Sequence, residues 1–181
     1  MDAKELRATL RADLAANRGY PKSVLVVVLL RIAQFVRALP GPAGRLAYIG
    51  VGAAYKFVVE WVLGIEIPAS TSIGPGLRLR HGVGTVVNPR AVLGSGVMLR
   101  HGVTIGNRRS ETDCPTIEDD VEFGAGATAI GSVRIGRGAR LGVNVVVIDD
   151  VPAGATVYSA STVTRQSRRR APEVGGQAPP R

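Results

Sequence analysis

Apolar residues recur every six positions between residues 65 and 157. An amphipathic helix repeats its apolar positions every 3.6 residues and a half-buried strand every two, so neither explains this period. A short flat strand followed by a tight corner does explain it, and glycine often stands directly after the first apolar residue. The repeats begin at Ile67, Ile73, Leu79, Val87, Leu93, Leu99, Ile105, Ile117, Phe123, Ala129, Ile135, Leu141 and Val147.

Three such repeats would close one triangular coil of 18 residues. Coils of this kind stack at the spacing of neighbouring strands, about 4.8 Å, and each covers the strand edges of the coil before it. We therefore predict a mainly β domain over residues 65–157, a parallel β-helix. A second small or apolar residue of each repeat should also point inward, at Thr71, Leu77, Val83, Ala91, Val97, Val103, Val121, Ala127, Val133, Ala139, Val145 and Val151.

Residues 1–64 carry a helical pattern instead. Leucines four apart indicate a helix over Ala3–Asn17, and Pro21 can begin a second helix that runs to about Leu39. Pro40-Gly41-Pro42 breaks the chain, and a third helix fits Ala43–Leu63. One interpretation is a helical module for packing or oligomerisation. The other is that the apolar faces of the second and third helices contact a membrane surface peripherally.

The formal net charge of +9 comes almost entirely from arginine, which favours anionic partners. The chain has no basic stretch interleaved with aromatic residues and no zinc-finger spacing, so we expect no nucleic-acid partner. Cys114 is the only cysteine, which excludes an intrachain disulfide and a cysteine-cluster zinc site, and we expect no metal.

The sequence shows no secretory signal pattern, and the longest uncharged apolar run, Ser23–Leu30, is too short to cross a bilayer. We therefore expect a cytoplasmic protein, with any membrane contact at the inner face. Residues 158–181 lose the six-residue pattern and are rich in arginine, proline and glycine. We expect them to form a basic, partly disordered tail.

Two interruptions of the six-residue period raise a functional question. Between Leu79 and Val87 eight residues replace six, and Asn107–Thr116 is a polar stretch that should leave the coil as a loop. His81 and His101 border these interruptions and are 20 residues apart, one coil plus the two extra residues. They should lie near one another on one face. A histidine at a solenoid corner is commonly a hydrogen-bonded surface group, but two of them beside a loop favour a site.

Several stretches together resemble a known family: Ile65-Glu-Ile, His81-Gly, Leu99-Arg-His-Gly-Val-Thr-Ile-Gly and Cys114-Pro-Thr-Ile. They are similar to the serine acetyltransferase branch of the hexapeptide-repeat acyltransferases, most of all to the colanic-acid-type polysaccharide O-acetyltransferases. The resemblance covers about residues 10–157. It implies a left-handed parallel β-helix, acetyl-CoA as co-substrate, and homotrimers, which serine acetyltransferases pair into dimers of trimers.

The resemblance implies that His81 is the general base. Its imidazole would take the proton from an acceptor hydroxyl as that oxygen attacks the acetyl thioester, a role that contributes roughly 10²–10⁴-fold. Glu66, 15 residues earlier, falls where the family has its partner carboxylate. Such a carboxylate fixes the histidine tautomer, although an isolated surface charge is the alternative. Arg80 replaces an aspartate that commonly precedes this histidine in the family.

Two departures from serine acetyltransferases concern the acceptor. Cys114 replaces a histidine that helps to hold serine, and the stretch Asn17–Pro21 lacks the aspartate of the family's Arg-Asp-Pro. Both match the polysaccharide-modifying subgroup. We therefore expect His101, Asp113 and Cys114 to contact the acceptor. A nucleophilic Cys114 is the alternative, with only neighbouring arginines to activate it.

The resemblance implies that coenzyme A lies in a groove between subunits. Small residues there would let its pantetheine arm approach backbone amides, although corner glycines need no such reason. The family's basic groups for the coenzyme phosphates are not matched cleanly, and Arg140, Arg165 or the run 168–170 would take their place. The matching positions are Gly106, Asn107, Gly124, Ala125 and Gly142.

The leading hypothesis is an acetyl-CoA-dependent O-acetyltransferase acting on a sugar hydroxyl of a surface polysaccharide or its precursor. The first alternative is L-serine O-acetyltransferase, which would take a small hydroxyl acceptor for cysteine biosynthesis. A catalytically inactive β-helix that serves as a scaffold is an alternative of another class. Nucleotide-sugar N-acetylation is a fourth.

Overall fold

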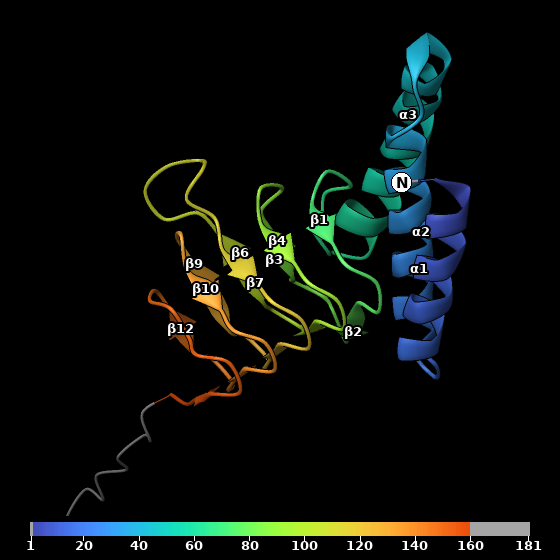
Figure 1. Cartoon of the computed structure of the whole chain (residues 1–181). Coiled ribbons are helices and arrows are strands. Elements are labelled where there is room, and N and C mark those ends of the chain that lie inside the picture. The colour runs from blue at the N-terminus through green and yellow to red at the C-terminus, as the bar shows by residue number, and fades with distance from the viewer. Residues whose placement is uncertain (1, 160–181) are drawn as a thin grey trace, which may run out of the picture.

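A layer of helices stands at one end of a coiled β-domain in the computed structural model, which describes residues 2–159 (Figure 1). The helices are α1 (Ala3–Ala16), α2 (Pro21–Arg37) and α3 (Gly41–Tyr55), and α3 continues as a π-helical segment, η1 (Lys56–Val62). Asp2 caps α1 through hydrogen bonds from the amides of Lys4 and Glu5, and prolines stand in the first turns of α2 and α3. The helices lie where the sequence predicts them.

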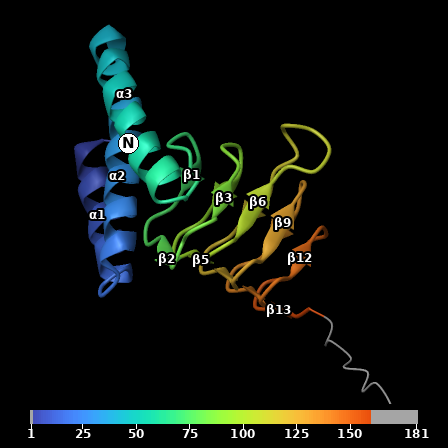
Figure 2. The ribbon, with the colours of Figure 1, turned by 180° about the vertical axis from the view of Figure 1, so that it is seen from behind.

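The β-domain winds through three parallel sheets, seen from two sides in Figures 1 and 2. Every described strand pair is parallel. The first sheet contains β1 (Ser72–Ile73), β4 (Val92–Leu93), β7 (Thr116–Ile117) and β10 (Arg134–Ile135). The second contains β2 (Arg78–Arg80), β5 (Met98–Arg100), β8 (Glu122–Phe123), β11 (Arg140–Leu141) and β13 (Thr156–Val157). The third contains β3 (Val86–Val87), β6 (Thr104–Gly106), β9 (Thr128–Ile130) and β12 (Val146–Val147).

The six-residue pattern forms the core of this solenoid. All the repeat starts are buried except Ile73, which is half-buried. The parallel β-helix with an N-terminal helical segment is therefore confirmed. Val83 is the exception among the second positions: we predicted it to point inward, but its side chain is 52% exposed. The two extra residues of the first coil shift the inward position to Thr85, whose buried hydroxyl donates a hydrogen bond to the carbonyl of Arg100.

Asn17, at the C-terminal cap of α1, and Arg31 of α2 close the open edge of the first coil. The amide of Asn17 donates from Nδ2 to the carbonyl of Leu77 and accepts at Oδ1 from the amide of Leu79, as a neighbouring strand would. Arg31 donates to the carbonyls of Ile73 and Gly74. Backbone groups at a strand edge need partners when they are buried, so these helices replace the coil that is missing.

A buried ion pair holds the two capping helices together. Arg31 Nε lies 2.8 Å from Asp13 Oδ2, and both side chains are almost fully buried. The other carboxylate oxygen of Asp13 accepts hydrogen bonds from the amides of Gly76 and Leu77. The pair therefore links α1, α2 and the first coil. Among the described residues no helix is long and apolar enough to cross a membrane.

Candidate active site

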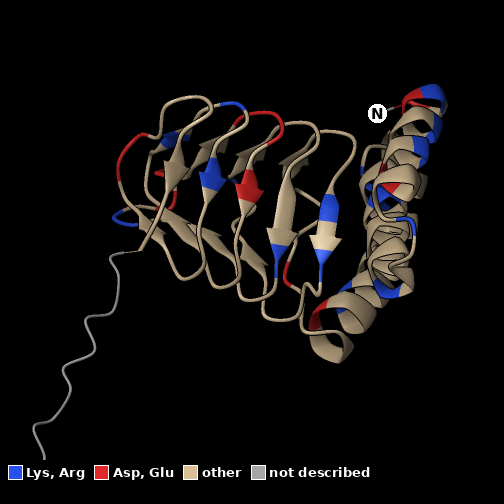
Figure 3. Ribbon diagram, turned by 90° about the horizontal axis from the view of Figure 1, so that it is seen from below, with Lys and Arg blue, Asp and Glu red and all other residues tan. Residues whose placement is uncertain are grey.

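His81 lies at a corner between the second and third sheets where the first coil has two extra residues. Arg80 at the end of β2 pairs with Arg100 at the end of β5, and Figure 3 shows the basic ends of these two strands beside each other. Five residues then lead to β3 in the first coil, whereas three lead to β6 in the second. The chain absorbs the excess in a bulge at which His81 has a φ of 59°, an uncommon left-handed conformation for a residue other than glycine.

His101 lies on the same corner one coil further along. The amide of Gly102 donates to the carbonyl of Val83, and in the next coil the amide of Gly126 donates to the carbonyl of His101. These matching bonds show that the residue stacked beneath His101 in the first coil is Val83, not His81. His81 lies two residues earlier, in the bulge. Both histidines are exposed at one corner, as the residue count predicts, but they are not equivalent positions.

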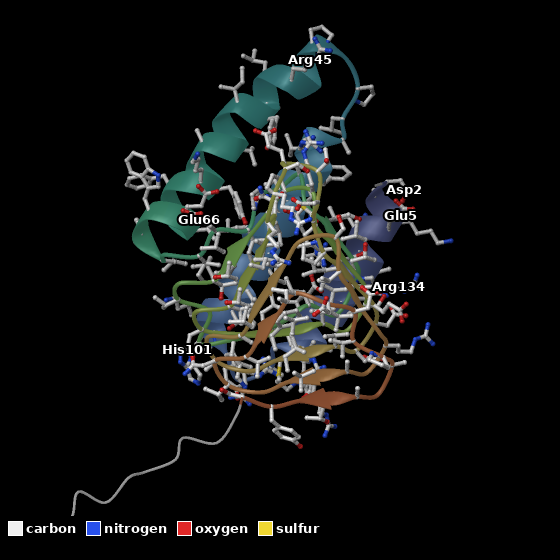
Figure 4. All side chains as sticks on the ribbon, turned by 90° about the vertical axis from the view of Figure 1, so that its left-hand side faces the viewer. Asp2, Glu5, Arg45, Glu66, His101 and Arg134 are labelled. Carbon is white, nitrogen blue, oxygen red and sulfur yellow. The ribbon has the colours of Figure 1, made fainter. Side chains whose placement is uncertain are left out.

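Glu66 lies on the chain segment beside the same bulge. Its amide donates to the carbonyl of Thr85 and its carbonyl accepts from the amide of Val87, each at 2.8 Å. The side chain is exposed and lies on the same side of the solenoid as His101 (Figure 4). Within residues 2–159 no hydrogen bond joins the Glu66 carboxylate to His81, so their dyad stays a prediction.

Tyr20, in the turn between α1 and α2, contacts the corner that carries His81 from the helical layer. Its ring stands at 80° to the His81 imidazole with the centroids 6.2 Å apart. The Arg80 guanidinium lies 4.1 Å from the centre of the Tyr20 ring, a cation–π contact. Arg80 is fixed by donating to the carbonyl of Ala16 at 2.9 Å and to Asn17 Oδ1 at 3.2 Å. These contacts hold an aromatic ring beside the candidate base.

The polar stretch after β6 does leave the coil as a loop, over residues 107–115, and Asp113 organises it. Thr116, which we predicted as the last loop residue, is instead the first residue of β7 and pairs with Val92. The Asp113 carboxylate accepts hydrogen bonds from three successive amides, those of Arg108, Arg109 and Ser110. Desolvation acts to raise the pKa of Asp113, but these backbone hydrogen bonds outweigh it and hold the pKa below its usual value. The carboxylate therefore orders the loop, and contact with the acceptor stays a prediction.

The Cys114 thiol lies at the end of this loop, half-buried, with Sγ 3.6 Å from the carbonyl oxygen of Glu111. Desolvation raises the pKa of Cys114, and the neighbouring Asp113 carboxylate raises it further, against a smaller opposing effect of Arg90. A raised pKa leaves less thiolate at neutral pH, which argues against a nucleophilic role.

The loop forms one wall of a surface groove of about 380 Å³. Its lining includes the basic Arg108 and Arg109 together with Asp113 from the loop, and the apolar Ile148. Such a combination suits a ligand that has both phosphate and apolar parts. These two arginines could hold coenzyme phosphates, and the sequence does not single them out for that role.

The candidate coenzyme positions lie at the two ends of the third sheet. Gly106 ends β6 and Asn107 begins the loop, where Asn107 Oδ1 accepts from the side-chain amide of Asn88 at 3.2 Å. Gly124, Ala125 and Gly142 occupy the opposite corner, beyond β8 and β11. A Cβ on Gly124 would come within 2.7 Å of the Gly142 backbone, so coil stacking already requires glycine there. Arg165 and the run 168–170 lie outside the described residues.

Sequence reasoning missed the contact of Tyr20 with His81 and the contact of Arg80 with the Tyr20 ring. The sequence drew attention to the Asn17–Pro21 stretch only for the aspartate that it lacks. Tyr20 sits between Gly19, which has a φ of 85°, and Pro21, so a sharp turn was readable. The position of Tyr20 beside His81, however, depends on how α1 and α2 pack against the first coil, which the sequence does not show.

The fold and the corner define a β-helix protein of the hexapeptide-repeat class. No protein-family model matches the chain. The chain is 34% identical over 148 residues to WcaB of Escherichia coli K12, named as a colanic acid biosynthesis acetyltransferase, across 80% of this chain and 91% of WcaB. It is 36% identical over 165 residues to a serine acetyltransferase of Synechococcus elongatus, across 86% of this chain and 64% of that protein.

Solved structures give the same relationship. The soybean serine acetyltransferase apoenzyme aligns with a TM-score of 0.72 and 31% identity over 84% of this chain and 66% of that one. The Brucella abortus serine acetyltransferase aligns in fold, with a TM-score of 0.74 and 24% identity over 88% of this chain and 68% of that one. The chain therefore belongs to the serine acetyltransferase-like branch of the hexapeptide-repeat acyltransferases, and it is an acetyl-CoA-dependent O-acetyltransferase.

Proposed function

We propose that the acceptor is a sugar hydroxyl of a surface polysaccharide or of its precursor. The observation that carries this proposal is the Tyr20 ring held beside His81 by Arg80. An aromatic ring offers an apolar face on which the C–H face of a sugar ring can pack, and its hydroxyl offers a hydrogen bond. The similarity to WcaB, whose name refers to colanic acid biosynthesis, supports the same acceptor class.

The proposed reaction is a direct transfer. The neutral imidazole of His81 removes the proton from the acceptor hydroxyl while that oxygen attacks the thioester carbonyl of acetyl-CoA. The carbon–sulfur bond then breaks, the acetyl group stays on the acceptor oxygen, and the coenzyme thiolate takes the proton back from the imidazolium. When the substrates are bound, Glu66 would orient the imidazole of His81 and stabilise the positive charge that it gains.

L-Serine is the second candidate acceptor, because several related enzymes are serine acetyltransferases. A free amino acid carries an ammonium group that a carboxylate would bind. Arg80 places a cation beside His81 instead, and the described contacts of its guanidinium are with carbonyls, an amide oxygen and the Tyr20 ring. Because both terminal nitrogens of Arg80 already donate to the protein, the carboxylate of serine would have to displace these hydrogen bonds, which favours a neutral acceptor.

We further infer that the protein works as a homotrimer with acetyl-CoA between subunits. The outward face of the third sheet has exposed valines, Val86 and Val146, beside the threonines Thr104 and Thr128, and the exposed Ile148 follows β12. Exposed apolar side chains on such a face are commonly covered by another subunit. A neighbouring solenoid there would enclose a coenzyme near Gly106 and leave the arginines of the loop over residues 107–115 within reach of its phosphates. The mass of the purified protein in solution tests this assembly.

The experiment for the acceptor measures thiol release from acetyl-CoA by the full chain. Acceptors would be L-serine, neutral sugars, uronic acids and repeat units of a surface polysaccharide. His81→Asn is the matched inactive control, because asparagine also tolerates the left-handed conformation of residue 81. We expect glycan-dependent release that the control lacks. Release with serine alone would replace the sugar proposal by the serine alternative, and no thiol release with any of these acceptors would support the inactive scaffold.

Glu66→Gln tests the dyad separately. The substitution keeps the size and polarity of the side chain but removes the charge that would stabilise the imidazolium. We expect roughly a tenfold or larger loss of kcat, equivalent to about 1.4 kcal/mol of transition-state stabilisation. An unchanged kcat would remove Glu66 from the mechanism and leave His81 as the base.

A further inference from the structure

A stripe of large apolar side chains runs along the outside of α3 and η1. Its members are Leu46, Ile49, Phe57 and Trp61, with exposed fractions of 71%, 68%, 59% and 76%. Ala53, which is also exposed, stands between Ile49 and Phe57. With it included, successive positions are three or four residues apart, so all of them lie on one helical face. We call these four residues the apolar stripe.

The opposite face of the same helix is the one that packs on the protein. Gly44, Tyr55 and Val59 are buried, and the Tyr55 hydroxyl donates to the carbonyl of Ile67 at 2.5 Å. Figure 4 shows the helix running outward from the chain near Glu66 to its far end at Arg45. The stripe is therefore held facing away from the core, and repacking within the subunit would break these contacts.

The charge around the stripe has one sign. Residues 14–64 contain one acidic residue, Glu60, and six basic residues, of which Arg31 is buried and paired with Asp13 and adds no charge to the surface. The single carboxylate is already paired with Lys56, at 3.7 Å. Arg45 and Lys56 flank the stripe on one side and are exposed, and Arg37 is exposed nearby at the end of α2. The surface therefore combines exposed apolar bulk with an excess of positive charge.

We propose that the apolar stripe docks in the headgroup region of a bilayer that contains anionic lipids. Aromatic side chains such as Trp61 and Phe57 suit the boundary between headgroups and acyl chains, and flanking arginine and lysine attract anionic lipids. A second copy of the chain fits less well. A twofold contact through the stripe would bring Arg45 and Lys56 of both copies together with no free carboxylate on the helix to offset them.

Trp61 makes the test direct because it is the only tryptophan in the chain. The full chain would be mixed with vesicles of pure phosphatidylcholine or of phosphatidylcholine with about one third phosphatidylglycerol, a mixture chosen for its negative surface potential. We expect a blue shift of Trp61 emission and co-sedimentation with the anionic vesicles. Because the attraction is screened by salt, binding should weaken as the ionic strength rises.

Matched variants distinguish vesicle binding through the apolar stripe from non-specific adsorption. The triple variant Leu46→Ser, Ile49→Ser, Phe57→Ser keeps the reporter, and we expect at least a tenfold weaker partition into anionic vesicles, in keeping with the loss of buried apolar area. Val92→Ser removes an exposed valine from the solenoid and should bind as the parent does. Arg45→Gln with Lys56→Gln should weaken binding and reduce its salt dependence.

Three outcomes would overturn the proposal: no change of Trp61 emission with any vesicle, equal binding of the triple variant, or a blue shift without vesicles that grows with protein concentration as the mass doubles. The last result would assign the stripe to a second copy. Acetyl transfer to a soluble acceptor should be the same in the triple variant and the parent. The docking inference and the acceptor proposal therefore fail independently.

Discussion

The ring of Tyr20 meets the imidazole of His81 edge to face, with the ring centroids 6.2 Å apart. The two residues come from different layers of the molecule, since Tyr20 belongs to the helical turn after α1 and His81 to the first coil. Asn17, three residues before Tyr20, supplies the hydrogen bonds that cap that coil. The helical layer thus closes the solenoid edge and also contacts the corner that carries His81, the candidate base.

Replacing Tyr20 by alanine should weaken acceptor binding without disturbing the coenzyme. We expect the KM for the acceptor to rise about tenfold, in line with the loss of roughly 1 kcal/mol or more of aromatic packing. The KM for acetyl-CoA should stay unchanged. Initial rates over a grid of both substrate concentrations measure the two constants separately.

Tyr20→Phe is the control, because it keeps the ring and its contacts with Arg80 and His81 while removing the hydroxyl. A small effect of phenylalanine together with a large effect of alanine assigns the role to the ring face. Equal changes in both KM values on Tyr20→Ala would instead mean that the whole corner had shifted, which contradicts a local acceptor wall.

His81→Asn should lower kcat by roughly 10²–10⁴-fold, the range for loss of a positioned base. Asparagine is preferable to alanine here because residue 81 has a φ of 59°, a conformation that asparagine tolerates. The KM for acetyl-CoA and the thermal midpoint should stay close to those of the parent. His101→Asn is the paired control, and a variant at 101 that loses as much kcat as the one at 81 would contradict the assignment of a single base.

The Cys114 thiol should react slowly with alkylating agents at neutral pH. Desolvation and the Asp113 carboxylate raise its pKa, so the thiolate fraction at a given pH is lower than in a free cysteine. The alkylation rate should therefore rise with pH, and its midpoint should lie at a higher pH than that of a small free thiol. Mass spectrometry of the iodoacetamide adduct over a pH series measures it.

Cys114→Ser should retain acetyl transfer, since the proposed chemistry passes through no acyl-enzyme. Accumulation of an acetylated Cys114 during turnover, or loss of all activity in the serine variant, would reverse this conclusion and restore the nucleophilic alternative.

The loop order that Asp113 provides should be lost in Asp113→Ala. Its carboxylate holds the amides of Arg108, Arg109 and Ser110, so trypsin should cleave after the two arginines faster in the variant. Glu111→Ala is a matched control from the same loop and should be cleaved like the parent. Indistinguishable cleavage of the Asp113 and Glu111 variants would show that the loop is ordered by other contacts.

The same carboxylate predicts a pH dependence. The pKa of Asp113 is lower in the folded protein than its usual 3.8, so the ordering is present at neutral pH and is lost as the pH falls through the lowered value. Amide proton shifts of residues 108–110 followed by NMR should titrate with a midpoint below 3.8. A midpoint above it would mean that the three hydrogen bonds do not stabilise the charged form.

The core of this fold was predictable because each repeat places its apolar residues by a local rule. Leu99 and Phe123 are buried for the same reason, and a period of six is legible without any tertiary knowledge. The prediction for Val83 was wrong because the sequence shows that the first coil has two extra residues but does not show where the chain accommodates them. The bulge at His81 absorbs them and moves the inward position to Thr85.

The candidate site was predictable only in part, since its contacts join distant segments. The nearness of His81 and His101 follows from coil length. The contact of Tyr20 with His81 does not, because it depends on how α1 and α2 dock against the first coil. That docking rests on buried polar groups, Asp13, Asn17 and Arg31, which look in the sequence like ordinary exposed residues of a helix. Polar burial of this kind is set by a partner elsewhere in the chain.

Arg31→Met should lower the free energy of unfolding far more than the substitution of an exposed arginine in the same helix. Asp13 would keep its buried charge and lose its ionic partner, and breaking a buried pair in this way costs about 3–5 kcal/mol. The carbonyls of Ile73 and Gly74 would also lose their donor. The free energy of unfolding in urea, followed by far-ultraviolet circular dichroism at a fixed protein concentration, measures the loss.

Arg37→Met is the control, because Arg37 is an exposed residue of the same helix, and surface substitutions usually change stability by less than about 0.5 kcal/mol. Arg31→Lys keeps the charge but cannot reach the carboxylate and both carbonyls at once, so its loss should lie between those of the two methionine variants. If Arg31→Met and Arg37→Met unfold at the same urea concentration, the ion pair does not hold the helical layer to the solenoid. If Arg31→Met alone is weakened, the acceptor KM should rise with it, because the same docking holds Tyr20 beside His81.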